Sequence, residues 1–354
     1  MRALRDRPRR RSAQLAAVGL TATVLVGFVT ASGAMAAPGD TSVNQFAVTH
    51  PIAGYAFSQP TAMAASGGNL FVANRRGNSV TELNAATGVW VRTITGFSTP
   101  TAVVGYGVDL FVANASGSVS EIDARTGRLV HVLAGATYGF SSPTSLAVYG
   151  TNLLVLNAGG SVTQVDAATG AVVRKIAGAT YGFNHPSQIV VAGSQAWVTN
   201  SVGNSVTEFD ATSGAWIRTL TSSSYQFQGP SGIAFDGSKL WVADTTDSQI
   251  TVIVAATGAL SRVFSAAAPG PAPVASGDLR VYVASPPGSS PMVTAYTAVD
   301  TSYQWMMCNS NGPYNFNNPQ SLLVVGDVLW VANASSNSLT QLSATTGAYM
   351  QRIA

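Results

Sequence analysis

The chain has 354 residues, with 18 basic and 15 acidic residues and a formal net charge of +3. It contains a single cysteine, Cys308, which excludes an intrachain disulfide framework, so stability has to come from packing. The length is sufficient for one large domain with a sizeable core.

The first 36 residues carry the three parts of a secretory signal peptide. Six arginines precede an apolar run at residues 15–31, and Ala34-Met35-Ala36 forms a small-residue cleavage site. A permanent membrane anchor is the alternative, but the run is short for a span and rich in Ala, Gly and Thr. We therefore expect residues 1–36 to be removed on export, with no membrane span afterwards. The Sec and twin-arginine routes both stay open.

Removal of this leader changes the charge of the chain. Taking six Arg and one Asp from the 18 basic and 15 acidic residues leaves 12 and 14, a net charge of about −2. The basic character therefore belongs to the leader, and the exported chain lacks the basic surface typical of nucleic-acid-binding proteins. We expect a secreted, extracellular protein without a nucleic-acid partner, and leave association with the cell wall open.

Residues 60–354 contain seven copies of a unit of about 43 residues, a period typical of structural repeats. The copies start near residues 60, 100, 143, 186, 230, 273 and 319, each at a proline, and the sixth copy is degenerate. The copy at 100–140 has four short runs rich in β-branched and apolar residues, separated by Gly, Asn and Asp turns. One unit is thus predicted to be a four-stranded antiparallel sheet.

The second strand of the unit indicates how the sheets pack. Leu110-Phe111-Val112-Ala113 is apolar on both faces, as expected for a strand that is covered on both sides. Sheets stacked face to face around an axis provide such burial. The sequence therefore predicts an all-β, seven-bladed β-propeller of four-stranded antiparallel blades.

The ends of the chain suggest how the ring closes. Residues 37–59 include a run that resembles an outer strand but has no blade before it, and residues 349–354 form another such run. Edge strands need partners. We expect 37–59 to be an N-terminal closing strand and the termini to close the ring on the last blade, with one strand added as an extra edge.

Two further features recur in the units. Tyr-x-Phe precedes most of the opening prolines, which favours an aromatic wedge between blades over a sugar-binding surface. An Asn ends most of the second strands, at Asn74, Asn114, Asn157, Asn200 and Asn333. Such residues could form an amide ring that binds carbohydrate or peptide, but an Asn that hydrogen-bonds to its local backbone explains the pattern better.

No catalytic constellation is evident. The innermost strands carry no charge, and the three histidines come from different units, so neither a metal site nor a cofactor is predicted. Departures from the repeat are better candidates for ligand binding. Arg75-Arg76 replace small residues, His185 lies in a connection, and a lengthened loop is expected at 302–318. The candidate ligand-binding residues are Arg75, Arg76, His185, Asp244, Tyr303 and Trp305.

The motif Leu110-Phe111-Val112-Ala113-Asn114 with the hairpin at 118–127 resembles the YVTN-type repeat of secreted and surface propellers. It also resembles the NHL-type repeat, which shares the proline-led innermost strand. Propellers of this kind serve as binding surfaces, cell-wall proteins and occasionally enzymes. The uncharged innermost strands and the dispersed histidines favour a non-enzymatic binding protein of the cell envelope or extracellular space, which we expect to be a monomer with a protein or glycan ligand on the loop-bearing face. The alternatives are a secreted lyase or hydrolase similar to the streptogramin lyases, and a self-assembling protein of the surface-layer type.

Overall fold

The computed structural model describes residues 54–354, except for 222, 268, 269, 271, 278, 286–290, 310 and 311. The chain divides into two units, residues 1–43 and 44–354. The predicted signal peptide and residues 37–53 of the predicted closing strand lie outside the described residues. None of the helical segments described is long and apolar enough to cross a membrane.

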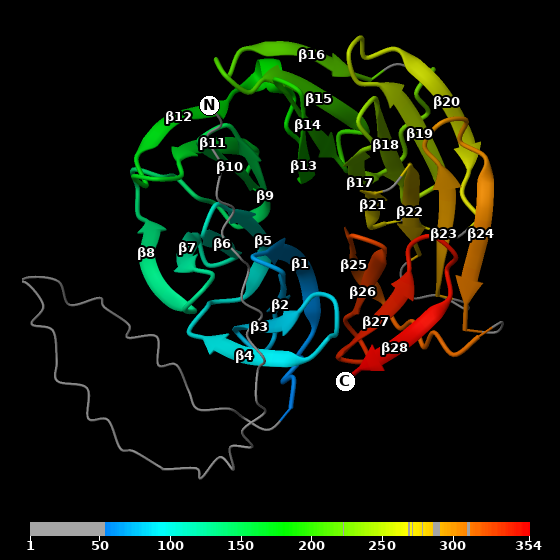
Figure 1. The fold of residues 1–354 in the computed structure, drawn as a ribbon. Coiled ribbons are helices and arrows are strands. Elements are labelled where there is room, and N and C mark those ends of the chain that lie inside the picture. Colours follow the sequence, from blue (N-terminus) through cyan, green and yellow to red (C-terminus); the bar gives the residue numbers. More distant parts are fainter. Residues whose placement is uncertain are drawn as a thin grey trace, which may run out of the picture. The chain divides into compact units, whose positions relative to one another are not determined.

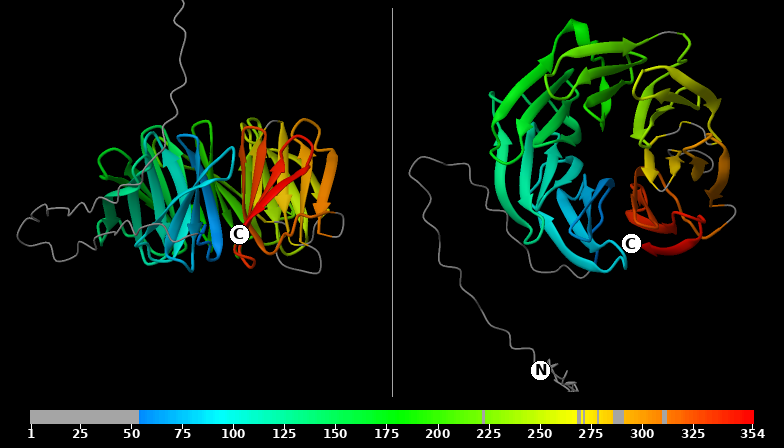
Figure 2. Two further views of the ribbon diagram at one scale, coloured as in Figure 1. Left: turned by 60° about the horizontal axis from the view of Figure 1, so that its bottom comes forward. Right: turned by 45° about the horizontal axis from the view of Figure 1, so that its top comes forward.

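The second unit is a ring of seven antiparallel sheets, each built from four strands that are consecutive in the sequence (Figures 1 and 2). The strands of the first four blades are as follows: β1 (Pro60–Ser66), β2 (Asn69–Asn74), β3 (Ser79–Asn84) and β4 (Trp90–Thr95); β5 (Pro100–Tyr106), β6 (Asp109–Asn114), β7 (Ser118–Asp123) and β8 (Arg128–Ala134); β9 (Pro143–Tyr149), β10 (Asn152–Asn157), β11 (Ser161–Asp166) and β12 (Val172–Ala177); β13 (Pro186–Ala192), β14 (Gln195–Asn200), β15 (Ser205–Asp210) and β16 (Trp216–Leu220). A short 3-10 turn, η1 (Ala179–Tyr181), precedes the fourth blade.

The strands of the remaining three blades are as follows: β17 (Pro230–Phe235), β18 (Lys239–Asp244), β19 (Gln249–Val254) and β20 (Leu260–Ser265); β21 (Val274–Gly277), β22 (Arg280–Ala284), β23 (Met292–Thr297) and β24 (Tyr303–Cys308); β25 (Pro319–Val325), β26 (Val328–Asn333), β27 (Ser338–Ser343) and β28 (Tyr349–Ile353). The seven-bladed propeller predicted from the sequence is therefore confirmed. The ring is joined where β1 of the first blade packs against β25 and β26 of the last blade. The described residues of the predicted closing segment, 54–59, form a loop that leads into β1.

The core lies between neighbouring blades. Phe111 of β6 and Leu133 of β8 pack with Leu153 and Val165 of the third blade, and all four side chains are buried. Both faces of the second strand are covered because each sheet is sandwiched between two others, which explains why that strand is apolar throughout. The blades thus depend on one another for burial of their apolar surface.

The Tyr-x-Phe connections are wedges, as the sequence predicts. The rings of Tyr138 and Phe140 stack with centroids 5.1 Å apart and pack against the cluster shared by the second and third blades. The Tyr138 hydroxyl donates a hydrogen bond of 2.9 Å to the carbonyl of Gly170. Tyr181 and Tyr225 make the same bond to Gly214 and Gly258. The aromatic pairs therefore fasten each connection to the next blade.

The sixth blade corrects one prediction. Residues 302–318 were expected to form a lengthened loop, but 303–308 form β24, the outermost strand of this blade. The hairpin before β24 lacks the usual Gly; Thr301 has the left-handed φ of 60° instead. Asp300 supports this turn by accepting hydrogen bonds from Ser302 and Thr297. Without the glycine the hairpin could not be recognised in the sequence, so the strand behind it was assigned to a loop.

Candidate functional site

The innermost strands of all seven blades line a cavity of about 770 Å³ on the propeller axis. About half of the residues that line it are polar, and the residue after the opening proline of a blade is usually one with a hydroxyl or an amide side chain. These residues are Thr61, Thr101, Thr144, Ser187, Ser231 and Gln320. The expectation that the innermost strands carry no charge is met in this lining.

Several of these polar groups also join neighbouring blades. The Thr101 hydroxyl donates to the carbonyl of Pro143 in the next blade, at 2.7 Å. The amide of Ile233 donates in turn to Oε1 of Gln188, at 2.9 Å. The innermost strands are thereby connected across the blade boundaries. Part of the hydroxyl and amide capacity of the lining is used in holding the ring together.

Among the described residues, Arg75 is the one charged residue in the lining of this cavity. It follows β2, and its backbone amide is held 3.0 Å from the carbonyl of Gln59. Arg76 comes next in the same exposed loop, and its backbone amide donates a hydrogen bond to the carbonyl of Ser58. The corresponding loops of the second and third blades place Ala115 and Ala158 against the cavity. The first blade therefore adds a positive charge to an otherwise neutral rim.

The asparagines that end the second strands are structural. Asn200 is fully buried; its side-chain amide donates to Ser205 and Thr207, and its oxygen accepts from the backbone of Asn184. Thr207 then donates to the carbonyl of Tyr181. Equivalent networks surround Asn74, Asn114, Asn157 and Asn333. Each Asn thus ties a second strand to the connection that precedes its blade.

Asp244 takes the place of this Asn in the fifth blade and is equally buried. One carboxylate oxygen accepts from the amide of Gln228 at 3.2 Å, and the other lies 3.0 Å from the Thr251 hydroxyl. Burial raises the pKa of Asp244 to about 7, and the nearby Asp247 adds to the rise. Asp244 is therefore enclosed beneath the loop-bearing face.

The predicted ligand-binding residues do not form one cluster. Arg75, Arg76, His185 and Asp244 belong to connections or strand ends on the loop-bearing face, and the His185 ring lies 3.2 Å from the side-chain oxygen of Asn184.

Tyr303 and Trp305 lie in the first half of β24 instead, towards the opposite face. The Trp305 ring covers the hairpin glycine Gly347 of the seventh blade. The other described histidine, His131 on outer strand β8, pairs with the buried Glu121 of β7. Among the described residues, no three His, Cys, Asp or Glu side chains are grouped as ligands for a metal ion.

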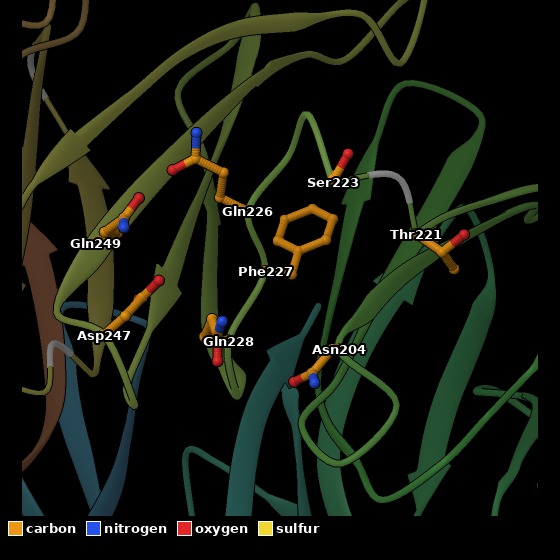
Figure 3. Close-up of a pocket in the computed structure, with 8 residues that line it drawn as sticks. All are labelled: Asn204, Thr221, Ser223, Gln226, Phe227, Gln228, Asp247 and Gln249. Carbon is orange, nitrogen blue, oxygen red and sulfur yellow. The ribbon is translucent and has the colours of Figure 1, made fainter.

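A second cavity, of about 330 Å³, lies between the fourth and fifth blades (Figure 3). Gln226, Asp247 and Gln249 are among the residues that line it. None of the three was identified from the sequence. The signal was present in the repeat, because the two preceding Tyr-x-Phe connections have Gly at the position of Gln226 and all four preceding blades have Ser at that of Gln249.

With this geometry in view, the chain can be compared with known proteins. It matches the family described as outer membrane protein assembly factor BamB over residues 31–224 and 202–353. No curated protein matches it.

Solved structures share the fold at low sequence identity. A chain of Kuenenia stuttgartiensis hydrazine synthase has a TM-score of 0.67 and 18% identity, covering 84% of this chain and 98% of that one. Virginiamycin B lyase from Staphylococcus aureus has a TM-score of 0.65 and 14% identity, with coverages of 78% and 92%. The computationally designed Ika8 protein has a TM-score of 0.62 and 15% identity, with coverages of 84% and 88%. These likenesses concern the fold alone.

Proposed function

The chain belongs to the family of outer membrane protein assembly factor BamB, and from that premise we propose that it is an exported, non-enzymatic binding propeller. Its partner is a protein or glycan of the cell envelope or extracellular space, held on the loop-bearing face. The resemblance to YVTN- and NHL-type surface propellers and the signal peptide pattern at residues 1–36 support this proposal.

The observation that carries the proposal is the position of Arg75. Its charge lies at the rim of a neutral cavity to which every blade contributes, and Arg76 is exposed beside it. A pair of cations with adjacent hydroxyls and amides suits a partner that presents carboxylates or other anionic groups among hydrogen-bonding ones. Neither arginine has an acidic partner among the ion pairs of the described residues.

The test is retention of the purified protein on an envelope fraction from its own source. Arg75→Ala/Arg76→Ala should reduce retention at least tenfold. Raising the salt concentration should weaken binding of the unchanged protein, because exposed charges are screened. Arg125→Ala/Arg128→Ala is the matched control: it removes the same charge from exposed residues of the β7–β8 hairpin, on the opposite face. Equal retention of both variants would refute the proposed location of the site.

The alternative is a secreted lyase or hydrolase that uses the same face. The shared fold of virginiamycin B lyase favours it as the second candidate. Among the described residues, His185 is the imidazole on this face, and it would serve as the base. His185→Ala should then abolish turnover of any substrate found, while retention on the envelope fraction stays unchanged. Full turnover by this variant would exclude His185 as the base.

We propose further that this binding propeller is a monomer. Self-assembly in the manner of a surface layer would instead give a mass that rises with concentration. Sedimentation equilibrium over a hundredfold concentration range separates the two, since a constant monomer mass is expected for the binding propeller.

A further inference from the structure

The cavity between the fourth and fifth blades is lined almost entirely by hydrogen-bonding side chains. Four side-chain amides (Asn204, Gln226, Gln228 and Gln249), two hydroxyls (Thr221 and Ser223) and the carboxylate of Asp247 surround it, together with Phe227. Figure 3 shows Gln226, Gln249 and Asp247 on one side and Asn204 and Thr221 on the other, with the Phe227 ring between them. The cavity is thus a polar pocket with one aromatic ring.

This lining is a local departure from the repeat. At the preceding interface, between the third and fourth blades, Gln226 is replaced by Gly182 and Asp247 by Gly203. Gln249 corresponds there to Ser205. Thr221 and Ser223 likewise stand where the third blade has Ala177 and Ala179. Five small residues have therefore become larger polar ones, and all five meet in a single pocket.

The blade does not need these side chains for its fold. Ser205 receives the Asn200 amide in the fourth blade, whereas Gln249 extends into the pocket and Asp244 bonds to Thr251 instead. Asp247 corresponds to Gly203 of the fourth blade. A Cβ at Gly203 would lie 3.2 Å from the Asn184 side chain, so a residue larger than Gly would be crowded at that position of the fourth blade. A repeat unit folds without this set, which favours a role in recognition.

Asp247 has an unused acceptor. Its Oδ1 is buried and has no hydrogen-bond partner among the described residues. A buried polar atom without a partner costs free energy, which a donor from a ligand would recover. Asp244 contacts two pocket residues: its carboxylate accepts from the backbone amide of Gln228, and its pairing partner on β19 is Gln249. A ligand with hydroxyl groups would supply the missing donor.

We propose that this pocket binds a neutral saccharide. Amides donate and accept at the same site and therefore pair with hydroxyl and acetamido groups, and the Phe227 ring offers carbon to the C–H face of a sugar. The carboxylate of Asp247 accepts from hydroxyls and repels anionic ligands. A volume near the low end of small-molecule pockets suits roughly one or two sugar rings.

The experiment is calorimetric or saturation-transfer NMR titration of the full chain with cellobiose, lactose and N,N′-diacetylchitobiose. At least one of them should bind in the millimolar range or tighter. The triple variant Gln226→Gly/Asp247→Gly/Gln249→Ser restores the residues of the preceding interface, and it should lose binding at least tenfold while its melting temperature stays close to that of the unchanged protein. Gln304→Ala, an exposed glutamine on β24, should bind normally.

Charge provides a second measurement. Glucuronic acid should bind more weakly than glucose, and Asp247→Asn should narrow that difference. Absence of binding by all three disaccharides, or equal binding by the triple variant, would overturn the proposal. This outcome can be distinguished from that for the proposed binding site around Arg75 and Arg76, because Arg75→Ala/Arg76→Ala should leave saccharide binding unchanged.

Discussion

The Asp244 carboxylate lies 3.0 Å from the Thr251 hydroxyl, and that hydroxyl also lies 2.9 Å from the carbonyl of Tyr225. A hydroxyl has one proton and can donate to only one of these two oxygens. In the fourth blade the conflict does not arise, because the Asn200 amide donates to Thr207, which in turn donates to Tyr181. A protonated Asp244 would reproduce this chain of donors.

Asp244→Asn should therefore stabilise the protein at neutral and alkaline pH. The folded pKa of about 7 lies above that of the unfolded chain, so the unchanged protein loses stability as pH rises from about 4 to 7. At about 1.4 kcal/mol per pKa unit, the gain above pH 7 is about 2–4 kcal/mol. Urea unfolding at pH 4 and pH 8 measures it, with Asn200→Asp as the reverse control. A gain that is equal at both pH values would contradict the pKa assignment.

The sequence predicted the parts of the fold that recur. The strand order, the number of blades and the Tyr-x-Phe wedges follow from patterns that occur several times in the sequence. Such a pattern can be recognised even when one copy is unclear. Where a signal occurs once, the prediction is wrong: the sequence predicts a loop in place of β24, because Thr301 stands where the other units have the hairpin glycine. The pocket between the fourth and fifth blades depends on residues from four separate segments, such as Thr221 and Asp247. Only the packing of one blade on the next brings them together.

The buried Glu208 depends on Arg218, which lies 2.7 Å away on the outer strand. Burial still raises the pKa of Glu208, so the arginine offsets only part of the desolvation. Arg218→Ala should destabilise the protein by about 3 kcal/mol, since it leaves a buried carboxylate without its partner. Denaturant unfolding measures the loss.

A second substitution separates charge from packing at this site. Adding Glu208→Gln to Arg218→Ala should recover much of the stability, because the third blade already has Gln164 at this position, where it donates to the carbonyl of Ala211 at 3.1 Å. The carbonyl of Ala255 is the corresponding acceptor for Glu208→Gln. No recovery in the double variant would mean that the loss came from the arginine's packing.

Tyr225→Phe should cost about 1 kcal/mol. Its hydroxyl donates a hydrogen bond of 2.7 Å to the carbonyl of Gly258, while the ring stacks on Phe227 with centroids 5.4 Å apart. The substitution removes the bond and keeps the stack, so the loss should be that of one hydrogen bond. Tyr55→Phe is the matched control for any effect of the substitution on ring stacking, since the Tyr55 ring stacks on Phe57 in the same way. A loss above about 3 kcal/mol would show that the aromatic packing had changed as well.

Trp305, which the sequence analysis predicts to bind a ligand, can be tested for a role in stability against a role in binding. Its ring packs on Tyr282 and covers Gly347, and its indole nitrogen is buried without a hydrogen-bond partner. Trp305→Phe should therefore keep most of the stability, because it retains an aromatic ring and removes the unpaired donor. Trp305→Ala should lose about 3 kcal/mol or more by opening a cavity between the sixth and seventh blades. Thermal unfolding, alongside retention on the envelope fraction, separates the two roles. Normal stability of Trp305→Ala with loss of retention would return this residue to the binding surface.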